Sequence, residues 1–169
     1  MKDKDPFATT ALTSMPADDA AQPARRTSAP MTHEDAGKFL ILVVDDAADN
    51  VAVISLALQH EGYRVVTASN GEEAISVAKA TLPNLILMDI SMPTMDGLAA
   101  TRRLRQTGPL AQVPVVAITA FGTEGFQRAA YDAGVAGYLT KPIDFARMNQ
   151  LVAGLLSPDA SGNLNRAAD

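Results

Sequence analysis

Short runs of apolar residues alternate along the chain with longer stretches of helical character. The runs cover residues 39–44, 63–68, 85–88, 115–118 and 137–139, and nearly every position in them is apolar. Such runs are typical of strands that are buried on both faces. Five of them separated by helices predict an α/β domain with a doubly wound parallel sheet and helices on both faces.

Capping residues indicate where the predicted helices begin and end. Asp49 or Asn50 is a candidate N-cap for the first helix, and Gly62 is a candidate end for it. Asn70 and Asp144 are candidate N-caps for the second and the last helix, since their side-chain oxygens can accept hydrogen bonds from unpaired backbone N–H groups.

The predicted first helix carries few polar residues. Its apolar positions are Val51, Ala52, Val53, Ile54, Leu56, Ala57 and Leu58. Such a helix either presents an apolar outer patch to a partner or is covered more deeply within the fold.

The two ends of the chain differ from its middle. The first 37 residues hold four of the ten prolines and lack any periodic apolar pattern, so we expect a disordered N-terminal arm over 1–37. Residues 157–169 are typical of a short flexible C-terminal tail, which leaves 38–156 as one folded domain. The tail is too short for an output domain, and we therefore expect this domain to act through a protein partner.

Composition excludes several classes of function. The formal net charge of −5 argues against nucleic acid or an anionic membrane surface as a direct partner, and the basic run 102–105 is typical of a solvated helix face. The absence of cysteine excludes disulfides, thiol chemistry and cysteine-ligated metals. No run approaches the roughly 20 apolar residues of a membrane span, and the N-terminus lacks the apolar core of a secretory signal, so a cytoplasmic location is expected.

Candidate chemistry follows the predicted strands. Asp45 and Asp46 follow the first strand, Asp89 the third, Thr119 the fourth and Lys141 the fifth. The carboxyl ends of parallel strands share one edge of the sheet. For strand order 2-1-3-4-5, the strand order reverses between strands one and three, and ligands bind at such a point. Asp46 and Asp89 are therefore expected to be neighbours.

Three carboxylates at one place repel one another unless a cation shares them. Oxygen ligands without histidine or cysteine favour Mg²⁺, or Mn²⁺ as a substitute. Lys141 and Thr119 suit an anionic group formed on a carboxylate, and Asp89 is the candidate nucleophile. The set points to phosphoryl transfer.

Several motifs in order resemble the receiver domain of two-component response regulators, of the stand-alone, CheY-like kind. They are LVVDD ending at Asp46, the run MDISMPTMDG from Met88 to Gly97, Thr119-Ala120, and GYLTKP from Gly137 to Pro142. The resemblance covers residues 38–156 and implies a flavodoxin-like fold. It also implies a signalling switch rather than an enzyme, phosphorylated by a histidine kinase or a histidine phosphotransfer protein.

The resemblance also implies roles for single residues. Asp89 resembles the phosphorylated aspartate, Asp46 a direct Mg²⁺ ligand and Asp45 a ligand through water. The main-chain oxygen of Ser91 completes the implied ligand set.

Three further residues resemble the family's switch and its phosphoryl partner. Thr119 and Tyr138 resemble the switch pair, and Lys141 resembles the lysine that pairs with the phosphoryl group. The bond from Lys141 to Pro142 is implied to be a cis peptide.

Two other interpretations stay open at this point. One is a receiver-like interaction module that is never phosphorylated. The other is a phosphatase with an aspartate nucleophile, but that chemistry needs an acid two residues after the nucleophile, where this chain has Ser91.

Overall fold

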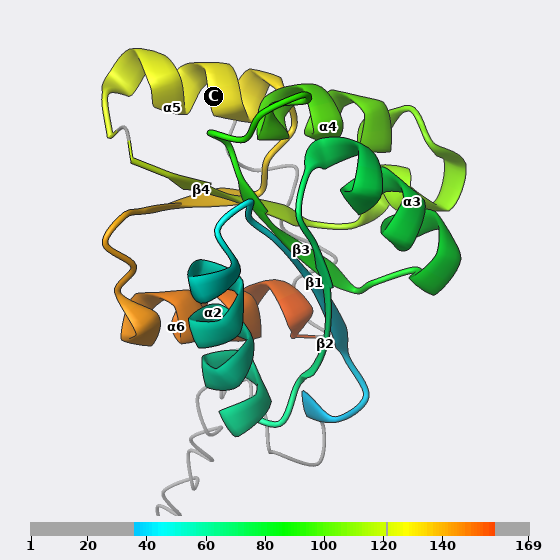
Figure 1. The fold of residues 1–169 in the computed structure, drawn as a ribbon, viewed down its shortest axis with the longest axis vertical. Coiled ribbons are helices and arrows are strands. Elements are labelled where there is room, and N and C mark those ends of the chain that lie inside the picture. The colour runs from blue at the N-terminus through cyan, green and yellow to red at the C-terminus, as the bar shows by residue number, and fades with distance from the viewer. Residues whose placement is uncertain (1–35, 121, 158–169) are drawn as a thin grey trace, which may run out of the picture.

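The computed structural model describes residues 36–120 and 122–157 (Figure 1). Within them, the strands are β1 Leu40–Val44, β2 Arg64–Ala68, β3 Leu85–Asp89, β4 Val115–Thr119 and β5 Gly137–Thr140. The helices are α2 Ala48–His60, α3 Gly71–Thr81, α4 Gly97–Arg105, α5 Glu124–Asp132 and α6 Phe145–Leu156, and a 3-10 helix spans Gly108–Gln112. Each strand lies within one residue of a predicted apolar run at either end.

The strands form one parallel sheet in the order β2-β1-β3-β4-β5, which confirms the predicted fold class. Val44 at the end of β1 pairs with Ala68 on one side and Met88 on the other. On the far side of β3, Thr119 at the end of β4 pairs with Thr140 at the end of β5. All strand ends therefore meet at one edge, and the order reverses between β1 and β3.

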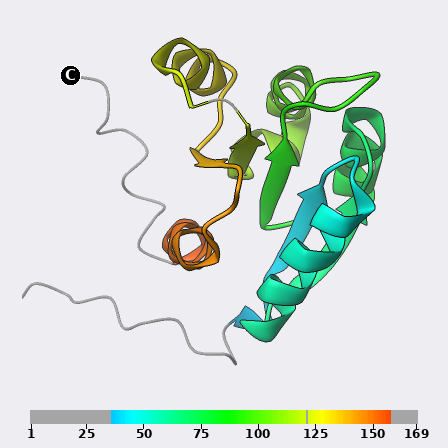
Figure 2. The ribbon, with the colours of Figure 1, turned by 60° about the vertical axis from the view of Figure 1, so that its left-hand side comes forward.

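Two apolar cores lie on opposite faces of the sheet (Figures 1 and 2). Along β1, Leu42 and Val44 belong to the core under α3, α4 and α5, whereas Ile41 and Val43 belong to the core under α2 and α6. Burial on both faces is the reason why the strand sequences are apolar throughout. Ala36, the first described residue, is also buried in the second core.

Two of the predicted helix caps are present. The side chain of Asn70 accepts a hydrogen bond from the N–H of Glu73 at the start of α3, at 2.9 Å. The side chain of Asp144 accepts one from the N–H of Arg147 at the start of α6, at 3.1 Å. Gly62, with a positive φ of 93°, follows the end of α2 as expected.

The prediction for the start of the first helix is wrong. Helix α2 begins at Ala48, its N-cap is Ala47, and no side chain caps it. Asp49 lies in the first turn, and the Asn50 side chain is hydrogen bonded to Asp45 instead.

Helix α2 has both a buried and an exposed apolar side. Ile54 and Leu58 are buried, but Val53 and Leu56 are 54% and 69% exposed. The apolar outer patch is therefore present on this helix.

The basic run on α4 is only partly a solvated face. Arg102 and Arg103 are exposed, as predicted. The half-buried Arg105 guanidinium donates to the carbonyl oxygens of Gly134 and Val113, each at 2.7 Å, and so ties the end of α4 to two loops.

The predicted arm and tail lie almost wholly outside the described residues, which leave out 1–35 and 158–169. Within the described ranges, no helix is both long and apolar enough to span a membrane.

Candidate functional site

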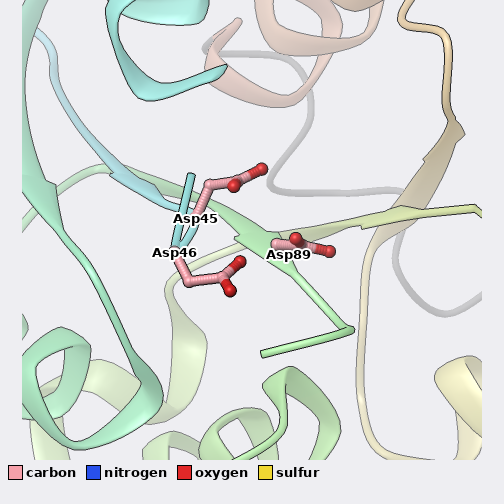
Figure 3. A group of neighbouring side chains, drawn as sticks. All are labelled: Asp45, Asp46 and Asp89. Carbon is pink, nitrogen blue, oxygen red and sulfur yellow. The ribbon is translucent and has the colours of Figure 1, made fainter. Parts of the chain in front are cut away.

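Three aspartates gather where β1 and β3 end (Figure 3). Carboxylate oxygens of Asp45, Asp46 and Asp89 lie within 4.8 Å of one another. Asp45 and Asp89 are 1% and 2% exposed, whereas Asp46 is exposed to solvent. The three aspartates therefore lie close together, as predicted from their positions after the first and third strands.

The sheet itself holds two of these aspartates in place. Asp89 is the last residue of β3 and pairs with Ile118 of β4. Asp45 directly follows β1, and its N–H donates to the carbonyl oxygen of Ala68 at 3.3 Å. Because both residues continue the backbone ladder, neither can move without disturbing the sheet.

Lys141 bridges the two buried carboxylates. Its Nζ donates to Oδ2 of Asp89 at 2.8 Å and to Oδ2 of Asp45 at 3.1 Å. Its backbone N–H donates to the carbonyl oxygen of Thr119, and the Lys141-Pro142 peptide is cis, as the resemblance implied. These contacts bring the end of β5 to the acidic cluster.

The charges of this cluster remain unbalanced. Burial lowers the pKa of Lys141, but its hydrogen bonds to Asp89 and Asp45 and their negative charges outweigh this and raise that pKa above its usual value. Lys141 is therefore a cation at neutral pH, but it is a single positive charge in contact with two of the three carboxylates of the cluster. A hard divalent cation with oxygen ligands fits this set.

Asn50 belongs to the site, although the sequence pattern suggested a helix cap. Its Nδ2 donates to Oδ1 of Asp45 at 3.2 Å and to Oδ2 at 3.1 Å. Asn50 is the third residue of α2, where side chains point back toward the helix start. Its place in the first turn of the helix that follows Asp45 was the sequence signal that could have identified Asn50 as a site residue.

The loop after β3 is held close to Asp89. The N–H of Ser91 donates to Oδ1 of Asp89 at 3.1 Å, and the N–H of Gly97 donates to the carbonyl oxygen of Ile90 at 3.2 Å. The backbone N–H of Ser91 thus lies beside the Asp89 carboxylate.

Thr119 and Tyr138 lie on the same face of the sheet but at different distances from its carboxyl edge. Thr119 ends β4 and is 1% exposed, whereas Tyr138 pairs with Ala117, two residues further from the edge. The Tyr138 ring makes an edge contact with Tyr131, centroids 6.2 Å apart, and the Arg147 guanidinium lies 5.9 Å from its centre. The structure therefore brings Thr119 to the site edge and places Tyr138 between α5 and α6.

Comparison with known proteins identifies one family. Residues 41–153 match the model of the response regulator receiver domain. The response regulator PleD from Caulobacter vibrioides is 41% identical over 115 residues, which are 66% of this chain and 25% of PleD. The chain thus spans about a quarter of the length of that relative.

Other relatives match over nearly their whole length. The polar-differentiation response regulator DivK from Brucella anthropi is 32% identical over 69% of this chain and 94% of its own. The receiver domain of the sensor histidine kinase PA1611 from Pseudomonas aeruginosa superimposes with a TM-score of 0.63 at 34% identity, covering 69% of this chain and 94% of that one. Its crystal structure has a magnesium ion coordinated in the active-site cleft.

Proposed function

The chain belongs to the response regulator receiver domain family of two-component signalling, and from this membership we propose that it is a phosphoryl-accepting switch. Asp89 accepts a phosphoryl group from a histidine kinase or a histidine phosphotransfer protein. The phosphorylated form then alters the binding of a target protein or passes the phosphoryl group on in a relay. The observation that carries this proposal is the buried Asp89 carboxylate, 2.8 Å from the Lys141 ammonium and grouped with two further aspartates.

The transfer needs little chemistry from the protein beyond placement and charge. One carboxylate oxygen of Asp89 attacks the phosphorus of the donor, a P–O bond forms, and the P–N bond to the donor imidazole breaks with its electron pair on nitrogen. Lys141 balances charge on the phosphoryl oxygens, because its ammonium already touches Asp89. The backbone N–H of Ser91 keeps the carboxylate oriented.

The same residues fit a divalent cation. We assign Asp46 and Asp89 as direct carboxylate ligands of Mg²⁺, or of Mn²⁺ in its place, Asp45 as a ligand through water and Ser91 as a main-chain ligand. When bound, the ion supplies positive charge next to the carboxylates and the incoming phosphoryl oxygens. The unbalanced negative charge of the cluster supports this assignment.

Labelling with a small phosphodonor tests the proposed function. In the presence of Mg²⁺, the chain should gain one phosphoryl group, seen as a mass increase of the intact protein, and excess chelator should abolish the gain. Asp46→Ala should weaken Mg²⁺ binding more than Asp45→Ala, because only the former removes a direct ligand. Full labelling in chelator would contradict the metal requirement, and no labelling under any condition would favour the unphosphorylated interaction module.

Thr119 and Tyr138 are proposed to report the phosphorylated state. A phosphoryl group adds a charge of about −1.5 to −2 and new acceptor oxygens beside the end of β4. The Thr119 hydroxyl can donate to them, and a shift of β4 toward Asp89 would make room for the Tyr138 ring to turn inward. The placement of both side chains on one face of the sheet supports this coupling.

Replacement of Thr119 by alanine should uncouple the switch. In the unaltered chain, a phosphoryl mimic should shift the backbone amide resonances of residues 122–132 and 138–143. Thr119→Ala should still bind the mimic but lose these shifts. Thr81→Ala, which removes a hydroxyl bonded only within α3, should keep them. Equal shifts in Thr119→Ala and in the unaltered chain would contradict the assigned switch.

A further inference from the structure

The carboxylate of Asp45 is held on both oxygens by protein donors. Oδ1 accepts from the N–H of Ala47 at 2.8 Å, and Oδ2 accepts from Nζ of Lys141 at 3.1 Å. Nδ2 of Asn50 lies almost equally far from the two oxygens, at 3.2 and 3.1 Å. The amide therefore faces the carboxylate end-on, and its hydrogen bonds resist rotation of the carboxylate about the Cβ–Cγ bond.

Asn50 is a suitable donor for this position because it carries no charge. Asp45 is 1% exposed, so its negative charge needs hydrogen-bond donors to replace the lost water. A lysine or arginine here would supply them, but its positive charge would repel a cation bound to the cluster. A neutral amide supports the carboxylate and leaves the negative charge of the cluster available to the ion.

The donor set also separates the roles of the two adjacent aspartates. Asp46 is exposed to solvent, whereas Asp45 is buried and turned toward protein N–H groups. Each Asp45 oxygen accepts from two protein donors, because the Asn50 amide adds to the Ala47 N–H on Oδ1 and to Lys141 on Oδ2. Each oxygen of Asp89, by contrast, accepts from only one. The more fully hydrogen-bonded Asp45 carboxylate is therefore the less able of the two to swing into direct contact with a cation. It can still accept a hydrogen bond from a water molecule bound to the ion.

We propose that Asn50 is a positioning residue of the cation site, which fixes the Asp45 carboxylate so that it supports the bound ion through water while Asp46 and Asp89 ligate it directly. This inference rests on the proposed function, because it assumes that the acidic cluster binds Mg²⁺. It adds a residue of α2 to the determinants of cation affinity.

The test measures Mg²⁺ affinity of the full chain without any phosphodonor. Amide resonances of Ala47 and Lys141 are followed during titration with MgCl₂, for the unaltered chain, for Asn50→Ala and for Asn149→Ala. Loss of a side chain that orients a metal-site residue typically weakens metal binding by 10-fold or more, so we expect a Kd about tenfold higher for Asn50→Ala.

Asn149→Ala is the matched control. Asn149 is also half-buried and its Nδ2 also donates to a carboxylate, Oε1 of Glu61 at 3.0 Å, but this pair joins α6 to the end of α2 away from the cluster. We expect its Kd to stay within twofold of the unaltered chain. A similar rise in Kd for both variants would overturn the proposal, because general loosening of the fold would then explain it.

A double-mutant cycle with Asp45→Ala shows whether Asn50 acts through Asp45. If it does, Asn50→Ala should cause no further loss of affinity once Asp45 has been replaced. An equal loss in both backgrounds, or an unchanged Kd for Asn50→Ala alone, would overturn the proposal. An unaltered chain that binds no Mg²⁺ would instead overturn the metal centre, so the two failures are distinguishable.

Discussion

Asp89→Asn is expected to abolish phosphorylation. Asparagine has nearly the shape of aspartate, and its side-chain oxygen can still accept the hydrogen bond from Ser91 N–H that Asp89 accepts at 3.1 Å. It lacks the anionic oxygen that is proposed to form the P–O bond, and it removes one of the three carboxylates of the acidic cluster. The variant should therefore fold but gain no phosphoryl mass with a small phosphodonor and Mg²⁺.

The matched control for this experiment is Asp96→Asn. Asp96 lies in the same loop region, but its side chain is exposed and caps α4 by accepting from the N–H of Ala99 at 2.8 Å. Asparagine is an equally good N-cap, so this variant should fold and be labelled like the unaltered chain. Labelling of Asp89→Asn at the rate of Asp96→Asn would show that another residue accepts the phosphoryl group.

Gly97→Ala is expected to destabilise the protein strongly and to disturb Asp89. A Cβ at Gly97 would overlap the main-chain oxygen of Asp89 and lie 2.8 Å from Cγ of Met88. A backbone oxygen in a sheet cannot yield as a flexible side chain can, so the loop or β3 has to shift. Overpacking of this kind costs about 3 kcal/mol, which corresponds to a fall of roughly 10 °C in the melting temperature.

Thermal unfolding monitored by circular dichroism measures the effect of Gly97→Ala. Gly154→Ala is the control, because Gly154 lies within α6 and a Cβ there meets nothing within 4 Å. That control should gain up to about 1 kcal/mol from the better helix propensity of alanine. If Gly97→Ala unfolds at the temperature of the unaltered chain, the close approach of α4 to β3 is not needed for stability.

The sequence was sufficient for the architecture and for the grouping of three aspartates at one edge of the sheet. Runs such as 85–88 are apolar because both faces of the strand are covered, and the first polar residue after each run therefore lies at the carboxyl edge of the sheet. For that reason, the grouping of Asp45, Asp46 and Asp89 could be predicted without coordinates. The caps Asn70 and Asp144 were predictable because capping involves residues only three apart.

The exact ends of two strands could not be predicted from the pattern of apolar side chains. The runs predicted that the third and fourth strands end at Met88 and Ile118, but β3 and β4 each continue by one polar residue, Asp89 and Thr119. Backbone hydrogen bonds hold these residues in the ladder, and such bonds do not depend on whether a side chain is apolar.

Only the tertiary structure could show contacts between distant segments or unexpected partners for a local side chain. Arg105 was predicted to be solvated, but its guanidinium donates a hydrogen bond to the carbonyl oxygen of Gly134, 29 residues away. At Gly97, where α4 begins, the main-chain oxygen of Asp89 leaves no room for a Cβ. Asn50 looked like a cap, but α2 begins two residues earlier, at Ala48, and the Asn50 amide donates to the buried Asp45 carboxylate. Local patterns determine which residues are buried or capped, whereas the partner of a polar side chain depends on which groups the completed fold brings within hydrogen-bond distance.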